Sequence, residues 1–207
     1  MKKTFGIRFG RIVLNVLRPF VFLLYPYKII GREKLPKDER PLVVCCNHIS
    51  MFDPILLMLA FRQPIYFMAK ESLFKNKLLG AILKSWFGVF PVNRGKGDTS
   101  AINKAFSIIE SGSALGIFPE GTRSKDGNLG PAKSGTALII AKMQADMRPC
   151  AVIAKNGKVK MFRRTTLVIG DTVTPEELHL TGEKPDIRHA SRSIMSIIGS
   201  MIEEHRV

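Results

Sequence analysis

The stretch "PLVVCCNHISMFDPILLMLAFR", Pro41 to Arg62, contains a strand, a turn and a helix in succession. The apolar run at 41–47 has the length of a buried strand, and the apolar run at 54–62 is longer and helical. Pro54 stands where the helix begins, a position that proline favours. A buried strand that leads through a short polar turn into a helix is typical of an α/β domain.

The same alternation continues to the end of the chain, which at 207 residues is long enough to bury one core. Strands or extended segments are predicted at 41–47, 65–70, 88–94, 114–121, 149–154 and 165–171, and helices at 54–62, 73–86, 98–112, 134–144 and 186–204. Strands that alternate with helices favour a parallel sheet. We therefore expect a single α/β domain over residues 29–207, with a mainly parallel central sheet flanked by helices.

The chain is strongly basic, with 32 Lys and Arg against 17 Asp and Glu, for a formal net charge of +15. This excess implies an anionic partner, which can be nucleic acid, an anionic membrane surface, or an acidic substrate or carrier protein. The cations are spread along the sequence, so charge alone does not choose among these. Cys45, Cys46 and Cys150 lack the spacing of a metal site or a disulfide framework, and we expect them to be small buried residues.

Residues 1–28 are predicted to form an amphipathic segment that associates with a membrane. On a helix, one face holds Phe5, Phe9, Ile12, Val16, Phe20 and Leu23, and the other holds Arg8, Arg11, Asn15 and Arg18. Pro19 is expected to break or kink this helix. The uncharged run at 19–27 is too short to cross a bilayer, so we expect an interfacial position with Tyr25 and Tyr27 at headgroup level. The alternative is that the apolar face packs on the domain itself.

The turn between the first strand and the first helix of the domain holds His48 and Asp53. Asp53 can simply cap the helix, since aspartate and a following proline are both favoured at helix starts. Alternatively, the loop folds back so that the carboxylate accepts the imidazole Nδ1–H, which fixes the tautomer and leaves Nε2 to act as a base. Asn47 and Ser50 can brace the same turn. No Gly-x-Ser-x-Gly nucleophile is present, so a two-residue relay that acts on a substrate hydroxyl is the favoured hypothesis.

A second polar turn, "FPEGTRS" at 118–124, follows another predicted strand. Gly121 can supply a positive φ there, and the planar guanidinium of Arg123 suits a phosphate. Arg94 ends the extended segment at 88–94, and Lys133 precedes a helix start, where anions are favoured. The alternative is a surface turn with a solvated arginine. Because sites in parallel sheets gather at the carboxyl ends of strands, we expect these turns to converge on one crevice.

The motifs "NHISMFD" (47–53), "GVFPVNR" (88–94) and "FPEGTRS" (118–124) have the order and spacing of one known family. The chain resembles the glycerolipid acyltransferases with the His-x4-Asp motif over roughly residues 30–175, and in size it is similar to the bacterial members that acylate 1-acylglycerol 3-phosphate. The family's fourth motif, an apolar segment with two prolines, keeps only Pro149 here. This departure leaves the preference for acyl chain or carrier open.

The resemblance implies transfer of a fatty acyl chain from acyl-CoA or acyl-acyl carrier protein to the sn-2 hydroxyl of lysophosphatidic acid, giving phosphatidic acid in phospholipid biosynthesis. It implies no cofactor and no metal, and a location on the cytoplasmic side of the cell membrane. Carried over residue by residue, it makes His48 the general base and Asp53 its orienting partner. The implied phosphate-binding residues are Arg94, Arg123 and Lys133, and the implied acceptor-binding or supporting residues are Asn47, Ser50, Glu120, Gly121 and Thr122.

Other function classes explain less of the sequence. A different acceptor, such as glycerol 3-phosphate or a lysolipid without phosphate, is the nearest alternative within the enzyme class. A nucleic-acid-binding protein would account for the net charge but not for the three motifs, and the basic stretches lack interleaved aromatic residues. A membrane-surface protein without activity would have no need of His48 and Asp53.

Overall fold

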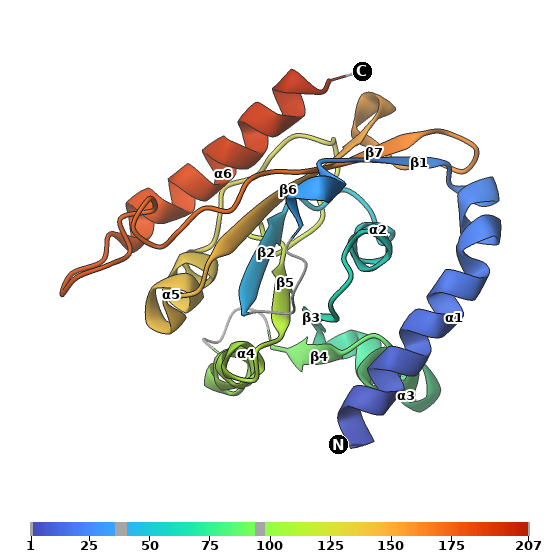
Figure 1. Cartoon of the computed structure of the whole chain (residues 1–207), viewed down its shortest axis with the longest axis horizontal. Coiled ribbons are helices and arrows are strands. Elements are labelled where there is room, and N and C mark those ends of the chain that lie inside the picture. Colours follow the sequence, from blue (N-terminus) through green and yellow to red (C-terminus); the bar gives the residue numbers. More distant parts are fainter. Residues whose placement is uncertain (1, 36–40, 94–97, 207) are drawn as a thin grey trace.

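A seven-stranded sheet forms the centre of the fold, in the order β1-β7-β6-β2-β5-β3-β4 (Figure 1). The strands are β1 (Tyr27–Ile30), β2 (Leu42–Cys46), β3 (Ile65–Lys70), β4 (Val89–Val92), β5 (Ala114–Ile117), β6 (Met147–Ala154) and β7 (Thr165–Ile169). Neighbouring strands are parallel except for β6 and β7, which are antiparallel. The mainly parallel sheet predicted from the sequence is therefore confirmed. The computed structural model describes residues 2–35, 41–93 and 98–206.

Helices cover both faces of the sheet (Figure 1). The α-helices are α1 (Lys2–Leu24), α2 (Asp53–Ala60), α3 (Lys77–Trp86), α4 (Thr99–Glu110), α5 (Ser134–Met143) and α6 (Ile187–Glu204), and 3₁₀ helices lie at η1 (Arg32–Lys34), η2 (Glu71–Phe74) and η3 (Lys155–Gly157). Side chains of α4, α5 and α6 pack in one apolar core, and those of α1 and α2 pack in a second core.

All five residues of β2 are buried, as expected for a strand in the middle of a covered parallel sheet. The adjacent residues Cys45 and Cys46 of β2 point into different cores, because successive side chains of a strand face opposite sides. Cys150 is buried as well, so the prediction of small buried cysteines is confirmed. Burial raises the pKa of the Cys46 thiol well above its usual value.

Helix α1 lies along the outside of the domain and packs on α3 (Figure 1). The close approach depends on glycine, because a Cβ at Gly10 would stand 2.3 Å from the carbonyl oxygen of Trp86. Pro19 lies inside the helix, so a break there, one of the two outcomes expected, is excluded. The carbonyl that loses its N–H partner belongs to Asn15, which is exposed, and water can satisfy it.

Most of the predicted apolar face of α1 points away from the domain, although Phe9 packs edge-on against Trp86 with ring centroids 5.3 Å apart. Its exposed fractions are 43% for Phe9, 60% for Ile12, 72% for Val16, 60% for Phe20 and 64% for Leu23, while the side chain of Phe5 lies outside the described part. The domain is contacted instead by other positions, among them the buried Ile7 and Leu14 and the guanidinium of Arg11, which donates to the Phe61 carbonyl. The alternative in which the apolar face packs on the domain is therefore contradicted for Ile12, Val16, Phe20 and Leu23. In the described ranges, no helix is long and apolar enough to span a bilayer.

Strand β1 was not predicted, and it corrects the position of one tyrosine. Tyr27 is buried in the second core, and its hydroxyl accepts a hydrogen bond from Arg18 Nε at 2.9 Å. Its ring is therefore packed inside the protein and is not free to contact lipid headgroups. Tyr25 stacks on Phe52, with ring centroids 4.8 Å apart, and so joins the end of α1 to the turn before α2.

Two further boundaries differ from the sequence prediction. The helix expected at 73–86 is divided into η2 and α3, because Asn76 caps α3 by accepting the N–H of Leu79 at 3.0 Å. The strand expected at 114–121 ends at Ile117, and the following residues form a turn at the carboxyl end of the sheet. That turn lies beside the one that follows β2.

Candidate active site

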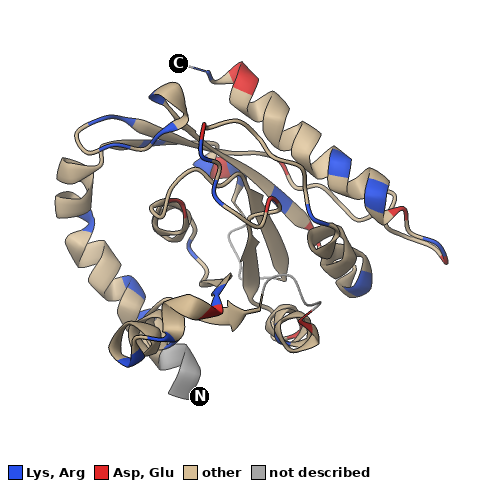
Figure 2. Ribbon diagram, turned by 180° about the vertical axis from the view of Figure 1, so that it is seen from behind, with Lys and Arg blue, Asp and Glu red and all other residues tan. Residues whose placement is uncertain are grey.

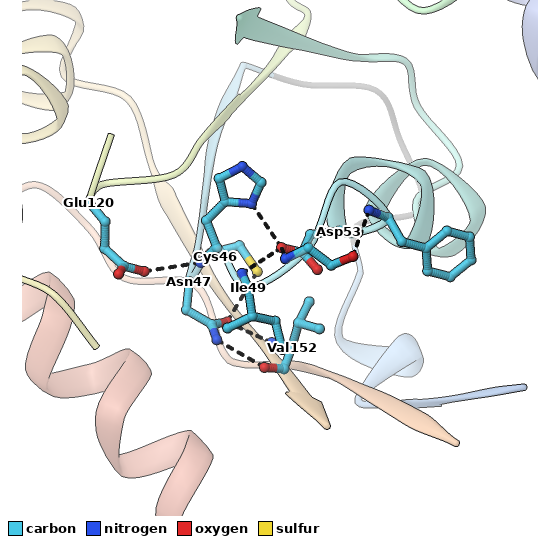
Figure 3. A network of polar contacts seen from close by, with 9 residues as sticks. Cys46, Asn47, Ile49, Asp53, Glu120 and Val152 are labelled. Carbon is cyan, nitrogen blue, oxygen red and sulfur yellow. Dashed lines mark hydrogen bonds and ion pairs between the residues drawn. The ribbon is translucent and has the colours of Figure 1, made fainter. Parts of the chain in front are cut away.

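His48 lies just beyond the carboxyl end of β2, where its ring is held by a buried carboxylate. The Nδ1 atom is 2.8 Å from Asp53 Oδ2, and the same oxygen accepts the N–H groups of Ile49 at 2.8 Å and Ser50 at 2.7 Å (Figure 3). The Asp53 side chain is fully buried, whereas 12% of the His48 side chain is exposed. An acceptor at Nδ1 places the proton there and leaves Nε2 as the basic nitrogen.

Asp53 is not a helix cap. It is the first residue of α2, with Pro54 next, and the capping position belongs to Phe52, whose side chain makes no capping hydrogen bond. The carboxylate turns back toward the loop that precedes the helix, and Ser50 Oγ accepts the N–H of Phe52 at 3.1 Å in the same turn. The hypothesis that Asp53 only caps the helix is therefore contradicted, and the folded-back loop is the arrangement found.

The plane of the His48 ring is fixed by an aromatic residue that was given no role from the sequence. Phe118 stacks on the imidazole with centroids 4.0 Å apart and planes inclined by 19°, and Phe67 lies behind it at 6.0 Å. Phe118 is the first residue of the "FPEGTRS" turn, so the turn after β5 supports the residue after β2. An aromatic residue at the end of a strand, next to a polar motif, is the signal that could have indicated this contact.

Glu120 ties the two turns together. Its carboxylate is buried, with Oε1 accepting the N–H of His48 at 3.0 Å and Oε2 accepting the N–H of Gly130 at 3.0 Å. The N–H of Ser124 donates to the His48 carbonyl at 2.7 Å. The turns after β2 and β5 therefore converge, and both carboxylate oxygens of Glu120 serve the backbone. Gly130, like Phe118, was not found by sequence reasoning.

Asn47 also has a bracing position. It is buried, and its side chain pairs with the backbone of Val152 on β6, donating to the carbonyl at 2.9 Å and accepting the N–H at 2.7 Å (Figure 3). This pairing extends the β2–β6 ladder by one residue beyond the end of β2. Asn47 thereby sets the direction in which the chain leaves the sheet toward His48.

Cationic and polar side chains lie around the second turn. Gly121 has a φ of +71°, as predicted, and a Cβ there would stand 2.9 Å from Lys133 Nζ, so the lysine ammonium lies directly over the glycine. Lys133 occupies the position before α5, and Arg123 and Thr122 are exposed. Arg94 follows β4 and lies outside the described residues.

The chemistry available at these two turns is proton transfer beside a turn that carries cationic side chains. A histidine with a fixed tautomer can remove a proton from a hydroxyl, and the buried carboxylate stabilises the imidazolium that forms. Ammonium and guanidinium groups at the neighbouring turn suit a phosphate. Within residues 2–35, 41–93 and 98–206, no three His, Cys, Asp or Glu side chains are grouped as metal ligands.

Comparison with known proteins gives a consistent result. A family model described as Acyltransferase matches residues 27–153. A 1-acyl-sn-glycerol-3-phosphate acyltransferase of Bacillus subtilis is 31% identical over 160 residues, which cover 76% of this chain and 78% of that protein. The chloroplastic 1-acyl-sn-glycerol-3-phosphate acyltransferase BAT2 of Brassica napus is 33% identical over 141 residues, covering 67% of this chain but only 40% of the longer plant protein.

The same fold occurs in a solved structure. The crystal structure of the 1-acyl-sn-glycerophosphate acyltransferase PlsC from Thermotoga maritima superimposes with a TM-score of 0.73, covering 96% of this chain and 82% of that one. The two sequences are 22% identical.

Proposed function

This chain belongs to the acyltransferase family, and from that premise we propose that it transfers a fatty acyl chain from an acyl thioester to the sn-2 hydroxyl of 1-acylglycerol 3-phosphate, forming phosphatidic acid. The observation that carries the proposal is the His48–Asp53 pair beside the turn of Arg123 and Lys133. The two relatives reported above are 1-acyl-sn-glycerol-3-phosphate acyltransferases, which supports this acceptor.

The proposed mechanism uses the geometry of the pair directly. Nε2 of His48 takes the proton of the acceptor hydroxyl as its oxygen attacks the thioester carbonyl. Asp53 stabilises the imidazolium through the 2.8 Å contact at Nδ1. The carbon–sulfur bond then breaks, the imidazolium returns its proton to the leaving thiolate, and the acyl chain stays on the acceptor oxygen. No covalent intermediate on the protein is required.

We assign the acceptor phosphate to the cations at the second turn. Arg123 can pair with two phosphate oxygens at once, and Lys133 offers a point charge above Gly121. We also propose that Arg94 binds this phosphate, because the motif at 88–94 resembles the family motif that contacts the acceptor phosphate. A phosphate held there anchors the acceptor while its hydroxyl approaches His48.

We further propose that the enzyme works at an anionic membrane surface on the cytoplasmic side of the cell membrane. The apolar face of α1 is exposed, with 72% of Val16 and 60% of Phe20 accessible to solvent. Such a face suits the boundary between lipid headgroups and acyl chains. Val16→Ser combined with Phe20→Ser should weaken binding to phosphatidylglycerol vesicles by about tenfold or more. The double variant lacks two apolar side chains whose transfer from water into the bilayer favours binding. Unchanged vesicle binding would count against α1 as an anchor.

The activity is tested with purified protein, lysophosphatidic acid and two donors offered separately, acyl-CoA and acyl-acyl carrier protein, with phosphatidic acid quantified by mass spectrometry. His48→Ala should reduce turnover by about 10³-fold while the protein stays folded. His189→Ala is the control, because it removes an exposed histidine of α6. Absence of phosphatidic acid with both donors, or a His48→Ala variant as active as His189→Ala, would overturn the proposal.

A further inference from the structure

The loop between β6 and β7, residues 155–164, is basic and carries exposed apolar residues at its tip. Its sequence "KNGKVKMFRR" holds five cations, and no Asp or Glu occurs from Met147 to Gly170. All five cations are exposed, and Figure 2 shows blue segments along this loop. At the tip, Met161 is 47% exposed and Phe162 is 67% exposed.

The backbone at the tip is unusual for so large a side chain. Phe162 has a φ of +58°, in the left-handed region that aromatic residues rarely adopt. This conformation costs free energy, and the exposed ring gains little from burial in return. Strain of this kind persists where the surrounding structure imposes it and is associated with functional sites. The tip therefore holds the Phe162 ring in an exposed position at a cost in backbone free energy.

The tip of the loop is joined to α1. The N–H of Phe162 donates to the carbonyl of Leu24, the last residue of α1, at 2.7 Å. Figure 1 shows the loop beside that end of the helix. Phe162 is thus bonded through its backbone to the residue that follows the exposed Leu23. An apolar tip at this place adds to the apolar surface of α1.

The start of the loop touches the turn after β5. Gly157 and Gly127 are in backbone contact, since a Cβ on Gly157 would lie 2.4 Å from the Gly127 Cα. The N–H of Gly127 is in turn held by Ser124 Oγ at 2.9 Å, and the N–H of Ser124 donates to the carbonyl of His48. The loop therefore connects the end of α1 to the turns that hold His48.

We propose that the loop at 155–164 is a second membrane-binding element, which inserts Met161 and Phe162 into an anionic bilayer and places its five cations against lipid phosphates. Cations beside an exposed aromatic residue match the charged and apolar layers of such a surface. With α1 and the loop both on the bilayer, the turns that hold His48 lie next to the bilayer surface, where a lysolipid resides. This inference rests on the proposed function, but its test does not require turnover.

An acidic carrier protein is the other partner that a basic loop can bind. Such docking uses the cations and gives no reason for Met161 and Phe162 to be exposed beside α1. The membrane explains both features of the loop. Binding of the loop variants to vesicles and to acyl carrier protein distinguishes the two partners.

The test compares the full-length protein with two double variants in co-sedimentation with phosphatidylglycerol vesicles and with phosphatidylcholine vesicles. Lys158→Gln with Lys160→Gln should reduce binding to the anionic vesicles by about 20- to 30-fold, since each cation near such a surface contributes roughly fivefold. Met161→Gln with Phe162→Asn should reduce binding to both kinds of vesicle by about tenfold or more. Asparagine tolerates the positive φ, so this variant should remain folded.

Lys104→Gln with Lys142→Gln is the matched control, because it removes two exposed lysines from α4 and α5. Its binding should stay within about threefold of the wild type, the effect expected of distant, screened charges. Turnover of lysophosphatidic acid dissolved as monomers should be unchanged in both loop variants. Failure of the wild type in that assay counts against the proposed function alone.

Wild-type vesicle binding by both loop variants overturns the proposal. The proposal is also overturned if the Lys158→Gln, Lys160→Gln variant binds vesicles normally but no longer binds immobilised acyl carrier protein. That result would assign the loop to the carrier protein. Thermal unfolding of each variant shows whether a loss of binding reflects a loss of fold.

Discussion

Asp53 Oδ2 lies 2.8 Å from His48 Nδ1 and at the same time accepts the N–H groups of Ile49 and Ser50. One oxygen atom therefore holds both the imidazole and the loop that carries it. Because two backbone donors in the turn need an acceptor, the fold of the loop itself fixes where this oxygen stands. The other carboxylate oxygen, Oδ1, is buried and has no hydrogen-bond partner among the described residues.

This arrangement leads to a specific expectation for Asp53→Asn. The amide oxygen should take the place of Oδ2, since the loop donors require it, and His48 should keep its tautomer while losing the negative charge beside it. A hydrogen bond to a charged group contributes about 1.5–3 kcal/mol, so kcat should fall about 10- to 150-fold, less than for His48→Ala. Steady-state kinetics on the two variants measures the difference.

Two results of that experiment would contradict the expectation. Activity close to the wild type would mean that Asp53 only braces the loop. A loss as large as that of His48→Ala would mean that the amide group is turned, so that its NH₂ faces Nδ1 and supports the wrong tautomer.

Glu120 should matter for stability, since both of its oxygens accept backbone N–H groups in a buried position. Glu120→Gln places an NH₂ group against one of these donors, and leaving a buried donor unsatisfied costs about 1–3 kcal/mol. The free energy of unfolding, from urea titration, should drop by that amount. Glu110→Gln, on the exposed side of α4, is the control and should change it little. Equal stability of the two variants would show that the two hydrogen bonds accepted by Glu120 contribute nothing to the free energy of unfolding.

A pair of glycine variants separates backbone strain from an effect on the site. Gly121 and Gly112 have similar φ values of +71° and +79°, but a Cβ would meet Lys133 only at Gly121, and at Gly112 it would meet nothing within 4 Å. Alanine at either position should cost about 1–2 kcal/mol of stability, the penalty of the left-handed conformation. Only Gly121→Ala, which displaces the lysine, should also raise KM for lysophosphatidic acid. A similar KM in both variants would remove Lys133 from the phosphate site.

The sequence was sufficient for those elements whose signals are local. The strand, turn and helix at 41–62 were found because the apolar runs and the Asp-Pro start lie next to one another. Helices α4 and α6 were found at 98–112 and 186–204. In the structure Asp98 and Asp186 cap them by accepting the N–H groups of Ala101 and His189. Caps, periodicity and glycine stops all act within one or two turns of the chain.

What the sequence missed depends on partners far away in the chain. Strand β1 has four residues directly after a long helix, and only its pairing with β7, Tyr27 against Thr165, makes it a strand. The role of Glu120 was hidden for the same reason. Its partners are backbone N–H groups of His48 and Gly130, and every residue except proline has one, so no side-chain pattern could indicate which of them it binds.

Variants of Arg123 test whether the cations of the second turn bind the acceptor phosphate. Arg123 is exposed beside this turn, and its guanidinium can pair bidentately with phosphate oxygens. Losing that contact should cost about 1.5–3 kcal/mol, so Arg123→Ala should lower kcat/KM for lysophosphatidic acid about 10- to 150-fold. Most of the loss should appear in KM, since the phosphate is remote from the reacting hydroxyl. Arg123→Lys should recover part of it, because the charge remains without the planar fork.

The control acceptor is a monoacylglycerol, which keeps the hydroxyl and lacks the phosphate. Wild type and Arg123→Ala should use it equally poorly, because the contact that the variant removes is not made with this substrate. Arg188→Ala, which takes an exposed charge from the first turn of α6, should resemble the wild type on both acceptors. Arg94→Ala, tested in the same way, examines the second arginine of the resemblance. If Arg123→Ala loses activity equally on both acceptors, the arginine serves folding or donor binding, and the phosphate assignment is wrong.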